Sequence, residues 1–286
     1  MESKEKKLKK GVALVTGASE GIGSELVKLF AKDGYDCVLV ARNKEKMDKL
    51  AAEVEKLYGI KTRVIARDLS LPQSAQEIFD ELKNAAVPVN VLVNNAGLGL
   101  YGDFAESDMD RNMHMLEVNL MSLTKLTWLF LPGMLARKSG KIMTVGSIAS
   151  FAPSPRFVLY NASKAYVLFL SEGLSKELKG TGVTVTCLCP GATRTQWHDR
   201  ANSENIRLHH FSRMIDARPV AELGYQALMR GKRLVIPGCD NNITVLLTKY
   251  APRALVLKIA DFLTQRSSSS SSCCCSGHMT KDACKD

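Results

Sequence analysis

Tyr160 and Lys164 are the pair of residues whose types and spacing most directly imply chemistry. They stand four positions apart in a run of small and apolar residues typical of a helix, which places both on one helix face. An ammonium beside a phenol favours the phenolate, so we expect the pKa of Tyr160 to fall below its usual ~10. Such a tyrosine can give a proton to a carbonyl oxygen as hydride reaches the carbon. Ser147 lies thirteen residues upstream, just past a predicted strand, where its hydroxyl can hydrogen-bond the same oxygen.

A glycine-rich turn near the start of the chain indicates where a cofactor would bind. It follows a predicted strand, precedes a predicted helix, and has two residues more between its first glycines than the usual G-x-G-x-x-G pattern. Gly17 permits a tight turn, Gly21 lets the backbone approach a phosphate, and Gly23 lets helix and strand pack closely. The helix N-terminus offers amide donors and a positive dipole to a pyrophosphate. We therefore predict a dinucleotide site formed by Gly17, Ser19, Glu20, Gly21, Ile22 and Gly23.

The end of the second predicted strand favours NADP over NAD. An acidic residue at that position binds the 2′-hydroxyl of the adenosine ribose in NAD enzymes. This chain has Arg42 there and no carboxylate before Glu45. A guanidinium can make two hydrogen bonds to a 2′-phosphate, so we predict NADP(H) as the cofactor. Glu20 in the glycine-rich turn weighs against this assignment.

The elements that must hold these residues alternate between short apolar runs and longer helical stretches. Helices are expected over about residues 22–33 and 44–58, each followed by a glycine. The short runs, read as strands covered on both faces, are Val12–Thr16, Asp36–Ala41, Arg63–Ala66, Val89–Val93, Lys141–Val145, Val183–Leu188 and Arg233–Ile236. This alternation predicts an α/β fold, a doubly wound, Rossmann-like sheet of about seven mostly parallel strands with helices on both faces.

Composition and charge limit the class of protein. The 286 residues are 45% hydrophobic and 24% charged, with a net charge of +10, which suits a soluble protein that buries its own core. Cys37, Cys187 and Cys189 fall in apolar, strand-like runs, as expected of reduced thiols in a cytoplasmic protein. The basic residues 1–10 are interpreted as a solvated, disordered terminus rather than a contact for nucleic acid or lipid. We expect no signal peptide, no transmembrane helix, no metal site and no nucleic-acid partner.

Taken together, these motifs resemble those of the short-chain dehydrogenase/reductase family, over roughly residues 10 to 240. In chain order they are Thr16 to Gly23, Asp68, Asn94 to Gly97, Asn119, Ser147, Tyr160 with Lys164, and Pro190-Gly191. The resemblance implies a single-domain, NADP-preferring oxidoreductase that reduces a ketone or aldehyde to an alcohol, reversibly, with Tyr160 as the acid/base. It implies that Asn119 holds a water linking Lys164 to solvent, and that Ser147 orients the substrate. The catalytic residues would be Asn119, Ser147, Tyr160 and Lys164. The further cofactor contacts would be Asp68, Leu69, Asn95, Ala96, Gly97, Tyr160, Lys164, Pro190, Gly191 and Thr193.

The chain divides into four parts on this view. The basic residues 1–10 come first, and a catalytic domain over 11–242, with a lid at about 195–217, follows them. An amphipathic helical extension over 243–263 comes next, and a disordered Ser/Cys-rich tail over 264–286 comes last. The extension could close the pocket, build a homo-oligomer interface or lie on a membrane surface. The three cysteines Cys273–Cys275 could carry palmitoyl groups or be idle thiols. The lid is aromatic and Met-rich, which fits an apolar substrate or a lid packed on its own core; it holds Trp197, His198, His209, His210, Phe211 and Met214. The rest of the pocket should come from residues 149–156.

Other interpretations of the function remain open at this point. The stretches Asn95–Phe104 and Ile236–Gly238 resemble a broad bacterial-type branch of reductases. That branch also resembles the endoplasmic-reticulum reductases of long-chain 3-oxoacyl thioesters and steroids. That alternative predicts peripheral contact with a membrane in place of a free cytoplasmic enzyme. A catalytically idle NADP-binding sensor normally lacks the tyrosine or the lysine, and this chain keeps both. An NAD-dependent dehydrogenase is opposed by Arg42.

Overall fold

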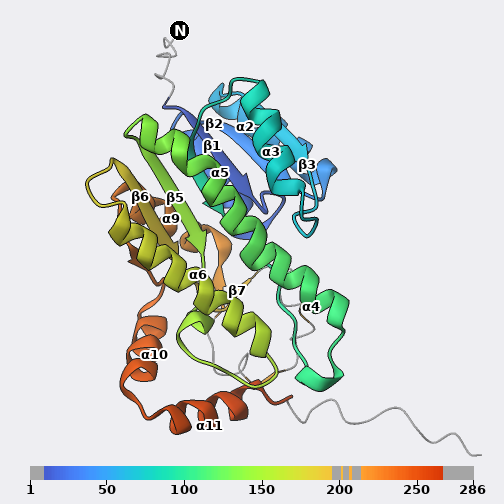
Figure 1. Ribbon diagram of the computed structural model, residues 1–286, viewed down its shortest axis with the longest axis vertical. Helices are drawn as coiled ribbons and strands as arrows, with labels where there is room; N and C mark the ends of the chain where they lie inside the picture. Colours follow the sequence, from blue (N-terminus) through green and yellow to red (C-terminus); the bar gives the residue numbers. More distant parts are fainter. Residues whose placement is uncertain (1–9, 195–200, 202–205, 208–213, 267–286) are drawn as a thin grey trace, which may run out of the picture.

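A computed structural model describes residues 10–194, 201, 206–207 and 214–266 of the chain (Figure 1). Its central sheet has seven strands, all parallel, in the order β3-β2-β1-β4-β5-β6-β9. The strands are β1 (Val12–Thr16), β2 (Asp36–Ala41), β3 (Thr62–Ala66), β4 (Val89–Asn94), β5 (Gly140–Val145), β6 (Val183–Leu188) and β9 (Leu234–Val235). The order reverses between β1 and β4, so the carboxyl ends of these two strands frame the crevice in which such sheets bind ligands. The predicted doubly wound α/β fold is confirmed.

Strand bounds follow the sequence prediction closely, and the differences lie at the ends. β1, β2 and β6 have the predicted bounds, while β3 and β5 each begin one residue earlier and β4 ends one residue later, at Asn94. A second sheet was not predicted. It pairs β7 (Thr193–Arg194) with β8 (Ile215–Asp216) in parallel, and strands of two residues are too short to leave a periodic signal.

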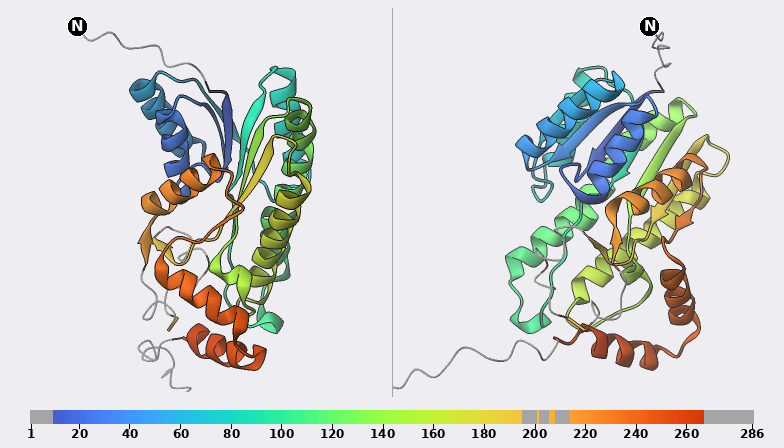
Figure 2. Two further views of the ribbon diagram at one scale, coloured as in Figure 1. Left: turned by 90° about the vertical axis from the view of Figure 1, so that its left-hand side faces the viewer. Right: turned by 180° about the vertical axis from the view of Figure 1, so that it is seen from behind.

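Helices cover both faces of the sheet (Figure 2). One face carries α1 (Gly21–Lys32), α2 (Lys44–Tyr58) and α9 (Ala217–Met229). The other carries α3 (Ser74–Asn84), α5 (Leu123–Ala136) and α6 (Val158–Glu177). Each layer encloses its own apolar cluster against the strands, and so the sheet is buried on both sides, as its unbroken apolar runs predict.

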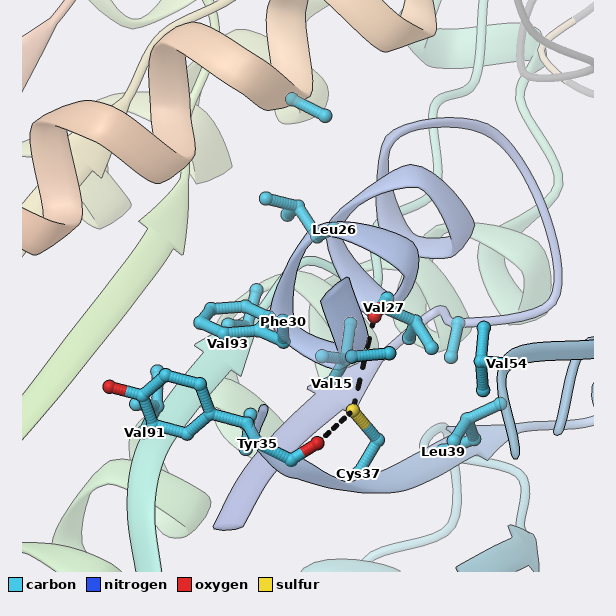
Figure 3. Close-up of a cluster of buried hydrophobic side chains, with 14 of the residues drawn as sticks. Val15, Leu26, Val27, Phe30, Tyr35, Cys37, Leu39, Val54, Val91 and Val93 are labelled. Carbon is cyan, nitrogen blue, oxygen red and sulfur yellow. Dashed lines mark hydrogen bonds between the residues drawn. The ribbon is translucent and has the colours of Figure 1, made fainter. Parts of the chain in front are cut away.

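The cluster under α1 shows how the strands and helices interlock (Figure 3). The ring of Phe30 makes edge contacts with Tyr35 at 5.6 Å and with Tyr225 at 5.1 Å between centroids. Cys37 lies among these side chains, with its Sγ 3.9 Å from Val27 O. Burial raises the pKa of the Cys37 thiol to about 12. The thiol is therefore a neutral, apolar core group, as the sequence indicates.

The ends of α2 have identifiable causes. The side chain of Asn43 accepts a hydrogen bond from the backbone N–H of Lys46 and so caps the N-terminus. Gly59 takes φ 68° after the last turn, in the left-handed region that glycine tolerates best. Both signals are local, so the predicted bounds of this helix are confirmed.

A continuous helical segment leads into the site from the other face. It runs through α4 (Met109–Leu116), a π-helical turn η2 (Glu117–Ser122), and α5. A π turn is rare and is frequently found at functional sites. Two short 3₁₀ turns, η1 (Phe104–Glu106) and η3 (Ile148–Phe151), complete the loops at this edge of the sheet.

The C-terminal helices lie beyond the carboxyl ends of the strands (Figures 1 and 2). They are α10 (Cys239–Tyr250) and α11 (Arg253–Thr264), so the helical extension begins at Cys239 rather than at residue 243. No residue of α10 is buried. Within the described part of the chain, no helix is both long and apolar enough to cross a membrane. Residues 1–9, 267–286 and most of the predicted lid, including Trp197, His198, His209, His210 and Phe211, lie outside the described residues.

Candidate active site

Helix α6 carries Tyr160 in its first turn and Lys164 one turn later. The ammonium of Lys164 donates a hydrogen bond to Val145 O at 2.9 Å and lies 5.9 Å from the centroid of the Tyr160 ring. Val145 is the last residue of β5, so this bond fixes α6 to the carboxyl edge of the sheet. The spacing of four residues therefore brings phenol and ammonium to one face, as the sequence predicts.

The expected fall in the pKa of Tyr160 is wrong for this structure. Burial of the phenol raises its pKa to about 12, although a hydrogen bond with the Ser147 side chain acts in the opposite direction. Burial also lowers the pKa of Lys164 to about 8. Desolvation disfavours the charged form of each group and is the largest cause of both shifts in pKa. The phenol is thus neutral at physiological pH.

Ser147 follows β5 by two residues and is the N-cap of η3. Its Oγ accepts a hydrogen bond from Ala149 N at 3.1 Å, while the Oγ of Ser150 accepts one from Ser147 N at 3.2 Å. Ser150 in turn donates to Lys164 O at 2.7 Å. The buried Ser150 hydroxyl therefore ties the turn that holds Ser147 to the helix that holds Lys164.

Asn119 lies in the π-helical turn and is buried. Its Oδ1 accepts from Leu98 N at 2.8 Å, and its Nδ2 donates to Leu98 O at 2.9 Å and to Ser163 Oγ at 3.0 Å. A Cβ on Gly97 would lie 3.1 Å from Lys164 Nζ and 3.5 Å from Asn119 Oδ1. Asn119 therefore fastens the loop after β4 to α6, and its predicted role in holding a water stays a prediction.

The glycine-rich turn has the geometry of a phosphate cradle. Gly17 and Gly21 take φ of 64° and 59°, where a side chain would be strained. A Cβ on Gly23 would lie 2.2 Å from Gly17 O, so only glycine lets the helix approach the turn this closely. Glu20 is the N-cap of α1 but makes no side-chain cap, which leaves the first amides of the helix directed at the turn. These donors fit a pyrophosphate.

Thr16 joins the turn after β1 to the turn after β4. Its buried Oγ1 donates to Val93 O at 3.2 Å and accepts from Asn95 N and from Ala96 N, each at 3.0 Å. The Asn95 side chain returns the contact by donating to Thr16 O at 2.9 Å. The loop from Asn95 to Gly97 is thus built against the glycine-rich turn, so both line the crevice between β1 and β4.

Basic groups gather at the end of β2. Arg42 is largely exposed and lies 3.9 Å from a carboxylate oxygen of Asp68. Burial would raise the pKa of Asp68, but hydrogen bonds from Ser70 N and Oγ and the nearby Arg42 hold it below its usual range. Lys46, which sequence analysis did not single out, lies 2.9 Å from Glu20. The carboxylate that weighs against NADP in the sequence is therefore paired with a lysine of α2.

The segment after β6 borders the same site. Pro190 O accepts a hydrogen bond from Ile148 N at 3.0 Å, next to Ser147. Thr193 is buried in β7 and donates its hydroxyl proton to Gly191 O at 3.0 Å. A Cβ on Gly191 would meet the side chain of Asn241 at 2.5 Å. Leu69, three residues after β3, is buried in the apolar cluster on the face of the sheet that carries α3 and α5.

The sequence did not single out the side chains that support these residues. Ser150 and Lys46 are small or exposed polar residues in ordinary surroundings, and only the fold reveals their partners. The same is true of Phe157, whose ring lies 5.9 Å from Tyr160. A pocket beside it is lined by Leu100, Tyr101, Gly102, Phe104, Ser107, Asn112, Arg156, Val158 and Leu159. Of the predicted pocket range 149–156, only Arg156 lines it.

The sheet order and the glycine-rich turn define a Rossmann-like α/β protein. A family model described as short chain dehydrogenase matches residues 11–206. The chain belongs to this family, and the resemblance predicted from its motifs is confirmed.

Curated relatives match over part of their length. The chain is 39% identical over 184 residues to a very-long-chain 3-oxoacyl-CoA reductase of Anas platyrhynchos, a match covering 62% of this chain and 58% of that protein. It is 34% identical over 184 residues to the Homo sapiens protein of the same name, with the same coverage. The match therefore spans a little more than half the length of these relatives.

Solved structures match over most of the chain. A short-chain dehydrogenase from Sphingobium yanoikuyae in complex with NADPH is 29% identical, with a TM-score of 0.73, covering 85% of this chain and 97% of that one. An alcohol dehydrogenase from Comamonas testosteroni, described as specific for bulky-bulky ketones, is 28% identical with a TM-score of 0.71, covering 86% and 97%. Both extend the likeness into the C-terminal third of the chain.

Proposed function

We propose that the chain is an NADPH-dependent reductase that converts a ketone or aldehyde to an alcohol, reversibly. The observation that carries the proposal is the convergence of Ser147, Tyr160 and Lys164 at the carboxyl edge of the sheet, behind the glycine-rich turn. The solved relative from Sphingobium yanoikuyae binds NADPH, which supports the choice of cofactor.

The residues at the crevice fit a dinucleotide. The amides of Gly21 to Gly23 would hold the pyrophosphate. Arg42, assisted by Lys46, would hold the 2′-phosphate, because both cations lie at the end of β2. Lys164 would hold the nicotinamide ribose. The remaining predicted contacts, Ser19, Glu20, Ile22, Asp68, Leu69, Asn95, Ala96, Gly97, Pro190, Gly191 and Thr193, would line the cofactor between these points. A nicotinamide bound there supplies the hydride.

Tyr160 would act as the acid in the reductive direction. Its pKa of about 12 keeps the phenol protonated at physiological pH, so the proton is available when charge develops on the carbonyl oxygen. Ser147 would donate a hydrogen bond to the same oxygen and orient it. When the proton leaves, the Lys164 ammonium and the Ser147 hydroxyl would stabilise the phenolate. Asn119 would hold the loop and α6 in register for this transfer.

The test is NADPH oxidation against a panel of carbonyl compounds, from small aldehydes and diketones to 3-oxoacyl thioesters and steroid ketones. Tyr160→Phe should lower kcat by about 100-fold or more while NADPH still binds. Tyr166→Phe is the matched control, because Tyr166 lies on the same helix but is exposed and pairs with Thr124 Oγ1 at 2.9 Å. Full turnover by Tyr160→Phe would assign the acid to another group. NADPH binding without turnover on the whole panel would favour the idle sensor.

A second candidate is a reductase of long-chain 3-oxoacyl thioesters that works at a membrane surface. The named activity of the curated relatives favours it. So does α10, which exposes an apolar stripe at helical spacing formed by Ile243, Leu246, Leu247 and Tyr250. We propose that this stripe is covered either by a lipid surface, as a peripheral contact of a cytoplasmic protein, or by a second copy of the chain.

Two measurements separate these partners. Sedimentation with anionic vesicles should carry the protein down if the stripe binds lipid, and Leu246→Glu should abolish that binding. Light scattering after gel filtration should report a dimer or larger assembly if the stripe binds a second copy, and the same variant should then give monomers. A monomer that leaves vesicles unbound would rule out both contacts.

A further inference from the structure

Three loops that leave neighbouring strands meet at residues 261–266, which we call the α11 end. Tyr101, after β4, donates its hydroxyl proton to Thr264 O at 2.7 Å. Arg156, between β5 and α6, binds Asp261. Arg207, after β6, donates its backbone N–H to Gln265 O at 3.0 Å and its guanidinium to the Gln265 side chain at 2.8 Å. In Figure 1, α11 lies at the bottom of the view, below the loop that leads into α6.

The Arg156 contact is the most elaborate of the three. One guanidinium nitrogen lies 2.9 Å from the Asp261 carboxylate and 3.2 Å from Thr264 Oγ1. A second nitrogen lies 3.9 Å from Asp103. The side chain of Arg156 is 24% exposed and that of Asp261 45%, so the arginine is the better shielded partner of a partly exposed ion pair.

The backbone of Arg156 needs such a restraint. Its φ is 64°, in the left-handed region, which costs a residue with a Cβ about 1–2 kcal/mol. Arg156 O accepts a hydrogen bond from Gly102 N at 2.9 Å, so the strained residue is held from the loop after β4 as well as from α11. Strain of this kind persists where surrounding contacts enforce it, and it concentrates at functional sites.

The strained residue directly precedes the helix that carries Tyr160. Phe157, the next residue, is the N-cap of α6, and its carbonyl accepts the first helical hydrogen bond from Asn161 N at 2.8 Å. The buried ring of Phe157 stands between Tyr101, at 5.2 Å, and Tyr160, at 5.9 Å between centroids. The path from the α11 end to the phenol therefore runs through one ion pair, one backbone turn and one aromatic contact.

We propose that Asp261 is a positioning residue for the proton transfer at Tyr160. By holding Arg156 in its left-handed conformation, Asp261 fixes the first turn of α6 and the placement of the phenol relative to Ser147. The inference rests on the proposed reductase function for its kinetic test, but its structural test is independent of any activity. It gives the C-terminal helix, which lies outside the matched family model, a part in the chemistry.

A charge exchange tests the pair. Asp261→Arg and Arg156→Asp each place like charges together and should lower kcat about tenfold or more, since small misplacements of reacting groups cost rates of this size. KM for NADPH should change less than kcat, because the groups proposed to hold the pyrophosphate and the 2′-phosphate lie in α1, at the end of β2 and in α2, away from the first turn of α6. The double variant restores opposite charges, and aspartate tolerates the left-handed region, so it should recover most of kcat. Glu81→Ala is the control, because its ion pair with Arg63 at 3.4 Å joins α3 to β3, and its side chain is 37% exposed against 45% for Asp261.

Hydrogen exchange provides the readout that needs no turnover. Asp261→Asn, the mildest change, should speed exchange at the amides of Gly102 and Asn161, which donate to Arg156 O and Phe157 O, and leave those of α1 unchanged, whereas Glu81→Ala should change neither. Unaltered exchange in the first turn of α6, or single and double charge variants with equal kcat, would overturn the proposal. A wild-type protein that reduces no carbonyl would instead reject the proposed function, and the exchange result would still decide the role of Asp261.

Discussion

Replacing Thr16 by valine tests the contribution of one hydroxyl, which is hydrogen-bonded to three backbone groups. The side chain is 1% exposed, and valine has the same shape, so packing is kept while the hydroxyl is lost. Ala96 N loses the partner it has at 3.0 Å, and Val93 O loses a donor at 3.2 Å. Asn95 N keeps its bond to Val93 O at 3.1 Å. The valine variant leaves one buried N–H without a hydrogen-bond partner and one carbonyl with one donor fewer. Together these losses should lower the free energy of unfolding by about 2–4 kcal/mol.

Thr16→Ser supplies the comparison, because it keeps the hydroxyl and removes only a buried methyl group. That change should cost about 1 kcal/mol. Urea denaturation gives both values, and fluorescence titration should find weaker NADPH binding for the valine variant alone, since the loop from Asn95 to Gly97 is held by the hydroxyl. A valine variant as stable as the serine variant would refute the assignment of this hydroxyl as the fastener of the two turns.

Three further predictions concern the cofactor cradle and the acid. Gly23→Ala should cost about 1–3 kcal/mol of stability and weaken NADPH binding, because its Cβ would meet a backbone oxygen, whereas Gly173→Ala in α6, with open space around it, should stabilise. Lys46→Ala should raise KM for NADPH about two- to fivefold and leave KM for NADH unchanged. Glu20→Gln should lower KM for NADPH, because it removes the carboxylate that pairs with Lys46. If Lys46→Ala changed KM equally for both nucleotides, Lys46 would not belong to the 2′-phosphate site. Because burial lowers the pKa of Lys164 to about 8, the ammonium is present below that pH, so kcat/KM for NADPH-driven reduction should fall as pH rises through about 8. A profile flat to pH 10 would show that its charge is not needed.

Sequence patterns predicted the strands and helices of the sheet because local signals determine where these elements begin and end. The unbroken apolar runs of β1, β2 and β6 and the glycine after α2 determine their own bounds, whatever lies across the sheet. The positions of Ser147, Tyr160 and Lys164 also follow, since each stands at a fixed distance from the end of a strand or along one helix face. The sequence shows which residues follow the ends of successive strands, and these residues meet because the carboxyl ends of parallel strands lie at one edge of the sheet.

The sequence could not predict the quantities that depend on burial and on partners far along the chain. The pKa of Tyr160 moves opposite to the expectation because desolvation of the buried phenol outweighs the hydrogen bond with Ser147. The contact of Arg156 with Asp261 joins residues 105 positions apart, and neither has a distinctive neighbour in the sequence. The short strands β7 and β8 are invisible for a different reason, since two residues cannot display a period.

The π-helical turn between α4 and α5 has a consequence for how this segment can change over evolutionary time. A π turn holds an additional residue relative to an α-helical one, so deleting a single residue from Glu117–Ser122 would let α4 and α5 join as one regular helix. The π turn takes up that residue locally, so the helix on either side could keep its orientation after the deletion, while residues inside the turn would move around the axis by up to about 100°. Asn119 lies inside the turn, so it would leave Leu98 and Ser163 although α4 and α5 stayed in place. The irregularity therefore determines the direction of one side chain at the site, and losing a single residue there would undo its contacts without disturbing the surrounding fold.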